Sequence, residues 1–285
     1  MTAIFDQMLS RHAVKTNDDY TNALHEVMQQ IALAGLHRGG FFDKAAFYGG
    51  TCLRIFHGME RFSEDMDFSL LREDPAFSLE NYFGAITAEF KALGRDIVIS
   101  KKQKARQTNV ESAFLKDDTA VYDLRFKKER GVKIKLEVDI HPPPGFSTEQ
   151  KLLLLPYSFM TRCYALPDLF AGKMHALMFR NWKTRVKGRD WHDFEWYVRN
   201  GVKLHFEHFR RRVLQFGSLE GGEMTEASFK RLLKEKIAAT NLNAVKADVR
   251  PFIKDARVME IWSADYFSQL ADMIQFSDAP PPTHE

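Results

Sequence analysis

A run of three prolines and a glycine, Pro142-Pro143-Pro144-Gly145, separates two parts of this chain that differ in character. Proline cannot donate to a strand ladder, so no strand continues through the run. The segments before it that are typical of strands are Asp96–Ser100, Glu111–Leu115, Ala120–Phe126 and Val132–Ile140. From Leu166 onward, apolar residues recur mostly at helical spacing.

These patterns predict an α+β protein. We expect a mixed α/β domain over residues 1–150, a mainly helical domain over residues 151–276 and a disordered tail over residues 277–285. The tail carries Pro280-Pro281-Pro282 and has few residues able to form a core.

Composition excludes several classes of protein. The chain has 285 residues, of which 45% are hydrophobic and 28% charged, as in ordinary globular domains. No stretch approaches the ~18 consecutive apolar residues of a membrane span, and Met1–Arg11 lacks the pattern of a signal peptide. Cys52 and Cys163 are far apart in sequence and form no disulfide framework, which favours a cytoplasmic protein. The net charge of +3 permits a polyanionic partner without requiring one.

The strongest chemical signal is a pair of aspartates in a segment with strand-like alternation, Phe62–Leu71. Residues two apart on a strand point to the same side, so Asp65 and Asp67 face one way while Met66 and Phe68 face the core. Two adjacent carboxylates repel each other, and a divalent cation removes that conflict. Such hard oxygen ligands suit Mg²⁺, which binds through one or two carboxylates together with substrate phosphates.

A glycine pair stands upstream of these aspartates, just before a helix expected over Thr51–His57. Gly49 and Gly50 have no side chains, so backbone N–H groups there can approach a polyphosphate, and the helix N-terminus adds a favourable partial charge. The hydroxyl of Thr51 is a further candidate phosphate ligand. Each piece alone also fits a tight turn or an exposed strand edge, but the two together in this order favour a phosphate-transfer site.

A third acid is available on the strand expected over Val132–Ile140. Glu137 and Asp139 are two residues apart and share one face with Lys133 and Lys135. In isolation this pattern also fits a solvated face with internal ion pairs, which contribute little stability. If the strand lies beside the aspartate pair, one of the two acids completes a metal triad. Glu137 is the first choice and Asp139 the second.

Two sequence blocks resemble the AbiEii/AbiGii toxin family of nucleotidyltransferases. They are Tyr48-Gly49-Gly50-Thr51-Cys52-Leu53-Arg54 and Arg61-Phe62-Ser63-Glu64-Asp65-Met66-Asp67-Phe68. That family belongs to the DNA polymerase β-like superfamily, so the resemblance implies a nucleotidyltransferase domain with a mixed sheet, followed by a mainly helical C-terminal domain. Ser63 falls at the rim of the implied site, where its hydroxyl either binds phosphate or caps local backbone. Arg61 either helps to hold phosphate or pairs with Glu64.

The resemblance continues in Pro167–Tyr197. The segments that carry it are Leu169-Phe170-Ala171-Gly172-Lys173-Met174-His175-Ala176-Leu177 and Lys187-Gly188-Arg189-Asp190-Trp191-His192-Asp193. It implies that Lys173 holds a triphosphate. Arg180 shares its helical face and is either a second phosphate clamp or the partner of an acid. Asp190 either orients Lys173 or acts as a base toward an acceptor hydroxyl. Asp193 equally fits the preference of acids for the first turn of a helix.

The implied reaction moves a nucleoside monophosphate from a nucleoside triphosphate to an acceptor hydroxyl, with Mg²⁺ as cofactor. The resemblance implies an RNA acceptor, with tRNA the leading candidate, and a toxin whose antitoxin is separately encoded in a toxin–antitoxin or phage-defence pair. The basic run Lys183–Arg189 favours a polyanionic acceptor. Two alternatives stay open: a nucleotidyltransferase acting on a small molecule, and a nucleotide-binding protein without catalytic activity.

Overall fold

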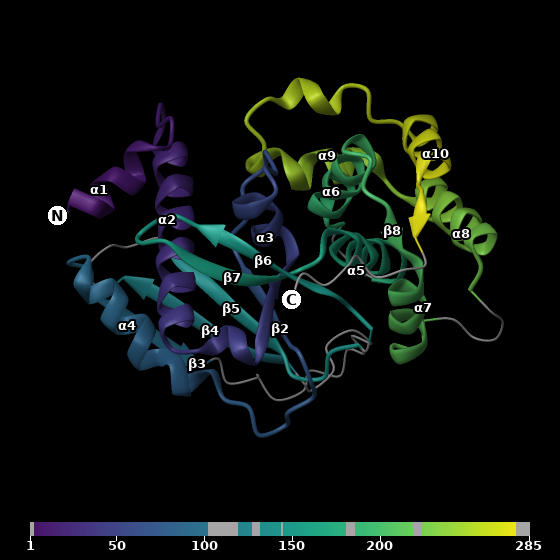
Figure 1. The fold of residues 1–285 in the computed structure, drawn as a ribbon. Helices are drawn as coiled ribbons and strands as arrows, with labels where there is room; N and C mark the ends of the chain where they lie inside the picture. The colour runs from purple at the N-terminus through teal and green to yellow at the C-terminus, as the bar shows by residue number, and fades with distance from the viewer. Residues whose placement is uncertain are drawn as a thin grey trace, which may run out of the picture. The chain divides into compact units, whose positions relative to one another are not determined.

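The computed structural model describes residues 3–101, 119–126, 132–143, 145–180, 186–218 and 224–277. The chain folds into two compact units (Figure 1). The first unit consists of residues 1–58, 62–142 and 149–163, and the second of residues 59–61, 143–148 and 164–285. The chain therefore enters the second unit briefly at residues 59–61, before the aspartate pair.

A mixed sheet forms the centre of the first unit, with seven strands in the described part of the chain in the order β3-β4-β5-β2-β1-β7-β6. The strands are β1 (Ala45–Tyr48), β2 (Met66–Leu70), β3 (Ile97–Lys101), β4 (Thr119–Phe126), β5 (Lys133–Asp139), β6 (Thr148–Leu153) and β7 (Phe159–Tyr164). Strand β2 runs antiparallel to β1 and parallel to β5, and β1 runs parallel to β7. The mixed sheet predicted from the sequence is confirmed.

Alternation along β5 gives the sheet one apolar and one polar face. Ile134, Leu136 and Val138 are buried, whereas the residues between them are at least partly exposed. Met66 and Phe68 of β2 are also buried. Burying each such side chain stabilises the fold by roughly 1.5–3 kcal/mol, which holds the acids and lysines of β5 on the opposite face.

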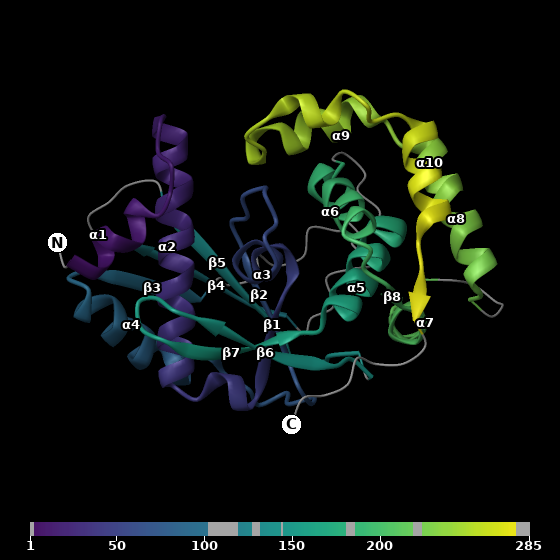
Figure 2. The same ribbon diagram turned by 45° about the horizontal axis from the view of Figure 1, so that its top comes forward.

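Helices complete the first unit: α1 (Ala3–Ser10), α2 (Asn17–Arg38), α3 (Gly49–Phe56) and α4 (Phe83–Ala92), with short 3₁₀ turns η1 (Phe41–Asp43) and η2 (Leu79–Tyr82). A capping box starts α2: the Thr16 hydroxyl accepts from the Asp19 N–H, and the Asp19 carboxylate accepts from the Thr16 N–H. Both Figures 1 and 2 show α2 running across the sheet. It packs against α4 so closely that a Cβ at Gly35 would lie 2.6 Å from the Ile86 backbone.

The second unit is mainly helical, as predicted. Its elements are α5 (Leu166–Phe179), α6 (Gly188–Arg199), α7 (Phe206–Gln215), α8 (Glu226–Ala239), α9 (Leu242–Val249), α10 (Ala264–Met273), the 3₁₀ turns η3 (Arg250–Phe252) and η4 (Ala256–Met259), and a parallel pair of β8 (Leu204–His205) with β9 (Phe276–Ser277). Aromatic contacts join the helices: Phe170 of α5 stacks on Tyr197 of α6 at 4.5 Å, and Phe209 of α7 meets Phe229 of α8 at 4.9 Å.

The domain boundary in the structure differs from the one predicted from the sequence, and two predicted segments lie wholly or partly outside the described residues. Strands β6 and β7 follow the proline run and still belong to the sheet, so the predicted boundary after residue 150 falls inside β6. The leucine-rich segment Lys151–Leu155 has no alternation, and periodicity alone does not identify such a strand. Glu111–Leu115 lies outside the described residues, as do residues 278–285 of the predicted tail, whereas Ser277 pairs in β9.

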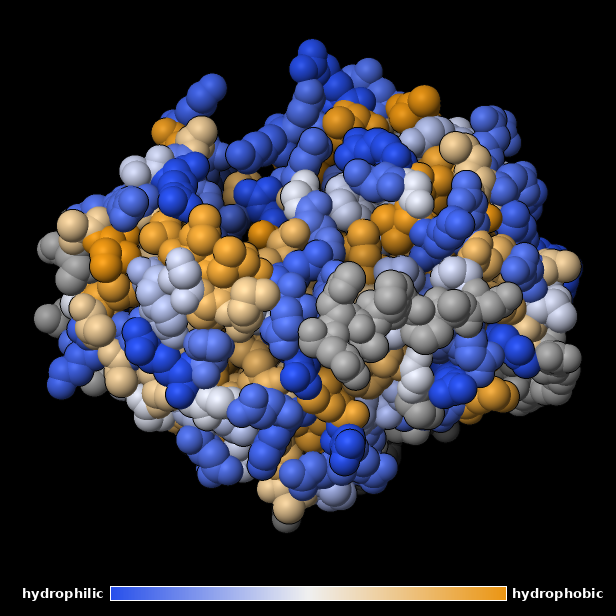
Figure 3. Space-filling view, in the orientation of Figure 1, coloured by the Kyte–Doolittle hydropathy of each residue, from blue (hydrophilic) through white to orange (hydrophobic). Residues whose placement is uncertain are grey.

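Polar residues are mixed with apolar ones on the face drawn in Figure 3. Strand β6 lies at one edge of the sheet. Three large apolar side chains on this strand and the segments next to it are exposed: Leu152, Leu154 and Met160.

Within the described ranges, no helix is both long enough and apolar enough to cross a lipid bilayer.

Candidate active site

Strands β2 and β5 carry an acidic face. Asp65 directly precedes β2, and Asp67 is the second residue of that strand. The parallel register sets Asp67 opposite Glu137 and Ser69 opposite Asp139. Partners in register on adjacent strands lie about 4.8 Å apart and point to the same face. Glu137 is therefore the acid next to Asp67, and Asp139 lies one pleat further along β5.

The start of α3 comes close to this acidic face. Tyr48 ends β1 opposite Asp67 in the antiparallel register, and α3 begins at the next residue, Gly49, with Gly50 as its second residue. Gly49 has φ +81°, and a Cβ there would lie 2.3 Å from Oδ2 of Asp67. Because the first N–H groups of a helix have no partner within the helix, this end of α3 can hold an anion beside the carboxylate.

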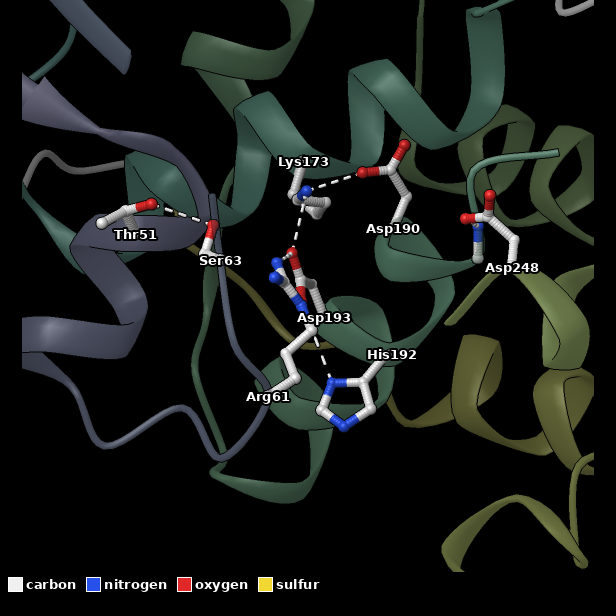
Figure 4. Close-up of polar contacts among 9 residues, drawn as sticks. Thr51, Arg61, Ser63, Lys173, Asp190, His192, Asp193 and Asp248 are labelled. Atoms are coloured by element: carbon white, nitrogen blue, oxygen red, sulfur yellow. Dashed lines mark hydrogen bonds and ion pairs between the residues drawn. The ribbon is translucent and has the colours of Figure 1, made fainter. Parts of the chain in front are cut away.

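Hydrogen bonds to buried side chains fix the loop that carries Asp65, and Figure 4 shows the one between Thr51 and Ser63. The hydroxyl of Thr51, a fully buried residue, bonds the Ser63 hydroxyl at 2.9 Å and the backbone carbonyl of Asp65. Gln29 of α2 donates its side-chain amide to the carbonyls of Ser63 and Glu64 at 2.9 and 3.1 Å. The hydroxyls of Thr51 and Ser63 thus serve the fold, and their binding of phosphate stays a prediction.

Gln29 is absent from the site residues predicted from the sequence. Its side chain is 1% exposed and lies among the buried positions of α2, which are otherwise apolar. The available signal in the sequence was a single amide side chain on the apolar face of a helix. Such a side chain indicates a buried hydrogen bond to another segment, because buried polar groups need partners. Its partners, on a loop more than 30 residues away, could not be read from spacing.

The donor set of the acidic face suits a hard divalent cation in its chemistry, but the carboxylates are not arranged as a ready-made triad. Among the described residues, no three His, Cys, Asp or Glu side chains are placed to hold a metal. Glu137 instead forms an ion pair with Lys135. Carboxylate oxygens are nevertheless the ligands that Mg²⁺ prefers. Asp65 and Asp67 would hold such an ion, and Glu137 would join them on leaving Lys135.

The second unit contains a buried ionic cluster (Figure 4). Nζ of Lys173, on α5, lies 2.7 Å from Oδ1 of Asp190 and 2.9 Å from Oδ2 of Asp193. Arg61 is 2% exposed and holds Asp193 through two hydrogen bonds of 2.5 and 2.6 Å, the bidentate geometry of strong ion pairs. Nη1 of Arg180 lies 3.8 Å from Oδ2 of Asp190.

The charges in this cluster keep one another ionised. Burial alone would raise the pKa of Asp193, but Arg61 and Lys173 hold it well below its usual range. Burial would likewise raise the pKa of Asp190, which Lys173 and other nearby cations lower. Burial would lower the pKa of Lys173, yet the two carboxylates raise it above its usual value. Lys173 is therefore an ammonium at neutral pH, whereas burial lowers the pKa of His192 to about 4 and leaves that ring neutral.

This geometry bears on the alternatives left open by the sequence. Asp190 contacts Lys173 directly, as it must if its role is to orient that lysine. Arg180 approaches Asp190 too, which agrees with the alternative that Arg180 is the partner of an acid. Arg61 pairs with Asp193, a residue 132 positions away, which is a partner that the sequence did not suggest for it. The roles of Lys173 and Arg180 toward phosphate, and of Asp190 as a base, stay predictions.

Comparison with known proteins decides the family. The family described as "Nucleotidyl transferase AbiEii toxin, Type IV TA system" matches residues 31–283 of this chain. The chain belongs to the AbiEii nucleotidyltransferase toxin family. It is accordingly a nucleotidyltransferase, and the family is that of toxins of type IV toxin–antitoxin systems. The resemblance inferred from the sequence blocks is confirmed.

Solved structures share the fold of this AbiEii family member. JHP933 from Helicobacter pylori matches with a TM-score of 0.51 and 19% identity, over 88% of this chain and 89% of that protein. MenT4, a nucleotidyltransferase toxin from Mycobacterium tuberculosis H37Rv, matches with a TM-score of 0.51 and 16% identity, over 94% and 98%. These similarities confirm the predicted fold class. A search among curated proteins gave no significant match.

Replacing Gly49 by alanine is expected to disable the acidic face while most of the fold survives. The new Cβ would push the Asp67 carboxylate aside, and a misplacement of about 1 Å can cost about 10²-fold in rate. The matched control is Gly58→Ala, since Gly58 has φ +74° and nothing within 4 Å of its Cβ position. Both variants should lose about 1–2 kcal/mol from the unfavourable backbone conformation. Equal rates of nucleotide transfer in the two variants would show that the close approach to Asp67 is unimportant.

The register predicts that Glu137, not Asp139, is the third acid of the site. Glu137→Gln is expected to lower the transfer rate by at least about 10–100-fold, which is the usual cost of losing even an outer-shell partner of a metal site. Asp139→Asn should have a much smaller effect, because Oδ1 of Asp139 accepts a local bond from the His141 N–H. The check is the initial rate of transfer across a series of Mg²⁺ concentrations. A larger loss in Asp139→Asn would reverse the assignment.

Proposed function

We propose that this AbiEii family member transfers a nucleoside monophosphate from a nucleoside triphosphate to a hydroxyl of RNA in a Mg²⁺-dependent reaction, with tRNA as the leading acceptor. The observation that carries the proposal is the close approach of the α3 N-terminus to Asp67, with Glu137 as its neighbour in register. A helix start can bind phosphate, and paired carboxylates can bind the cation that accompanies it. A protein that only bound nucleotide would not need both.

The residues of the first unit have distinct roles in this proposal. Bound Mg²⁺ would neutralise phosphate charge and help to activate the attacking hydroxyl. Asp65 and Asp67 would hold the cation, and the N–H groups at the start of α3 would orient the phosphates. Thr51 and Gln29 keep the Asp65 loop in position through their bonds to its backbone. Positioning of this kind is the main contribution of a protein to phosphoryl and nucleotidyl transfer.

An RNA acceptor is supported by what the sequence resemblance implies and by charge. Each phosphate that contacts a lysine or arginine releases condensed cations, so a basic surface favours a polyanion over a neutral small molecule. Lys183 and Arg185 of the predicted basic run lie outside the described residues, so this part of the proposal comes from the sequence. The family also supports a separately encoded antitoxin as a partner.

The acceptor is tested by incubating the protein and Mg²⁺ with each α-labelled nucleoside triphosphate in turn, together with total RNA. The products are sized on a denaturing gel, and the double variant Asp65→Asn/Asp67→Asn is the negative control. The proposal predicts label in a band of tRNA size with at least one nucleotide. Label found only in small molecules would move the acceptor to that class, and no transfer with any nucleotide would contradict the proposal.

Lys173 stays our candidate for a triphosphate contact, and Lys173→Arg tests that role with little disturbance of the fold. Arginine keeps the charge beside Asp190 and Asp193, but its planar fork does not replace a compact ammonium. We expect KM for the nucleoside triphosphate to rise about tenfold or more, which corresponds to about 1.4 kcal/mol, with a nearly unchanged melting temperature. An unchanged KM would assign Lys173 a purely structural role in its buried cluster.

A further inference from the structure

We propose that Lys135 is a built-in counter-ion of the acidic face, and that a metal ion must displace it from Glu137 in order to bind fully. The inference deepens the proposed function, because it concerns the same carboxylates.

The position of Lys135 supports this role. It lies two residues before Glu137 on β5, on the polar face, and its Nζ contacts Oε1 of Glu137. Its ammonium also interacts electrostatically with Asp65 and Asp67. The Lys135 and Glu137 side chains are only 34% and 27% exposed, so water screens this ion pair less than it would on an open surface.

A second lysine on the same face provides the contrast. Lys133 precedes Lys135 by two residues and pairs with Asp123 of β4 at 2.7 Å, with half of its side chain exposed. Asp123 lies opposite Lys135 in the strand register, yet Lys135 contacts Glu137 instead. Lys133 therefore contacts an acid of β4, whereas Lys135 contacts an acid of the acidic face.

Electrostatics then predicts a competition. Neighbouring carboxylates repel one another, and a single ammonium relieves part of that repulsion. A divalent cation relieves more of it, and it competes with the Lys135 ammonium for the negative charge of the Glu137 carboxylate. Each metal-binding event therefore includes the cost of breaking the Lys135–Glu137 pair. Lys135 should stabilise the metal-free protein and weaken its affinity for metal.

The test measures Mn²⁺ binding to the full chain without nucleotide or acceptor, by the electron paramagnetic resonance signal of free Mn²⁺. Lys135→Met is compared with wild type and with Lys133→Met, which removes an equal charge from the same strand face. We expect Lys135→Met to bind Mn²⁺ at least about threefold more tightly than Lys133→Met, and to melt lower than wild type without metal. Lys135→Gln, which keeps polarity without charge, should shift the affinity in the same direction and covers the case in which the methionine variant fails to fold.

Mn²⁺ affinity in Lys135→Met and Lys135→Gln that is equal to or weaker than that of Lys133→Met would overturn the inference, as would an absence of Mn²⁺ binding in all the proteins. Because no nucleotide is present, this result is separate from the proposed function. A protein that binds Mn²⁺ as expected but transfers nothing to RNA would contradict the proposed function and leave the role of Lys135 intact. Transfer to RNA, together with no effect of the Lys135 substitutions on Mn²⁺ affinity, would support the proposed function and overturn the role of Lys135.

Discussion

Asp67→Asn is expected to reduce the rate of nucleotide transfer by at least about 10³-fold, since a catalytic metal supplies several kcal/mol of charge stabilisation and about 4 kcal/mol corresponds to that factor. Asparagine keeps the size of the side chain but loses the charge that holds the cation. Asp65→Asn should have an effect of the same order. The folded state should persist, because Asp67 is partly exposed and its strand is anchored by buried Met66 and Phe68.

The rate is measured as pyrophosphate released in the presence of Mg²⁺, and the melting temperature is recorded for each variant. Asp43→Asn is the charge-matched control, because Asp43 is an exposed acid of the same unit in η1. We expect the control to keep its activity. If Asp67→Asn released pyrophosphate at the wild-type rate, the acidic face would not be the catalytic centre.

Asp193→Ala is expected to cause the largest loss of stability, about 3–5 kcal/mol, because removing one partner of a buried ion pair leaves the other charge uncompensated. Here Arg61 would stay buried without the carboxylate that accepts its two bonds, and Lys173 would lose one of its two acids. The measurement is the free energy of unfolding in urea.

The surface pair of Asp255 and Arg257 is the control for this loss. Its bonds, of 2.7 to 3.0 Å, have similar chemistry, but the Arg257 side chain is 81% exposed. Asp255→Ala should therefore destabilise the protein much less than Asp193→Ala, since water can solvate what is left. Equal losses of unfolding free energy in Asp193→Ala and Asp255→Ala would show that burial does not determine how much the Arg61–Asp193 pair stabilises the fold.

The pH dependence of the Asp193 contribution has a definite sign. The pKa of Asp193 is lower in the folded chain than in the unfolded chain, so its contribution is complete above the unfolded pKa of about 4. It is lost as the pH falls toward the folded pKa. The difference in unfolding free energy between wild type and Asp193→Asn should be constant above about pH 5 and should shrink below about pH 4. A difference that grew in acid would contradict the assignment.

Local patterns explain how much of this molecule is predictable from its sequence. The alternation around Asp67 predicts the burial of Met66, Phe68 and Leu70 in β2, although Ser69 is buried as well. The glycines before Thr51 predict a helix at this point, and α3 includes them, since it starts at Gly49 rather than at Thr51. Both patterns depend on neighbours in sequence, whose directions follow from helix and strand geometry. The sequence also favours Glu137 over Asp139 as the third acid of the site, but that choice holds only if β5 lies beside β2.

Long-range pairings are the part that spacing does not reveal. The parallel register of β2 with β5 joins strands about 70 positions apart in sequence, and Arg61 reaches Asp193 over 132 positions. Asp193 fits the first turn of a helix so well that nothing local identifies it as a buried partner. Lys135 likewise reads as one of two solvated lysines until the structure shows which carboxylate each one meets.

The catalytic assignment is tested by following two labels in parallel reactions. The protein is incubated with RNA, Mg²⁺ and a nucleoside triphosphate labelled at either the α- or the γ-phosphate. We expect that the α-label enters the RNA, that an equal amount of γ-label leaves as pyrophosphate, and that Asp67→Asn abolishes both. Entry of the γ-label into the RNA, or transfer of the α-label that persists in Asp67→Asn, would contradict the assignment.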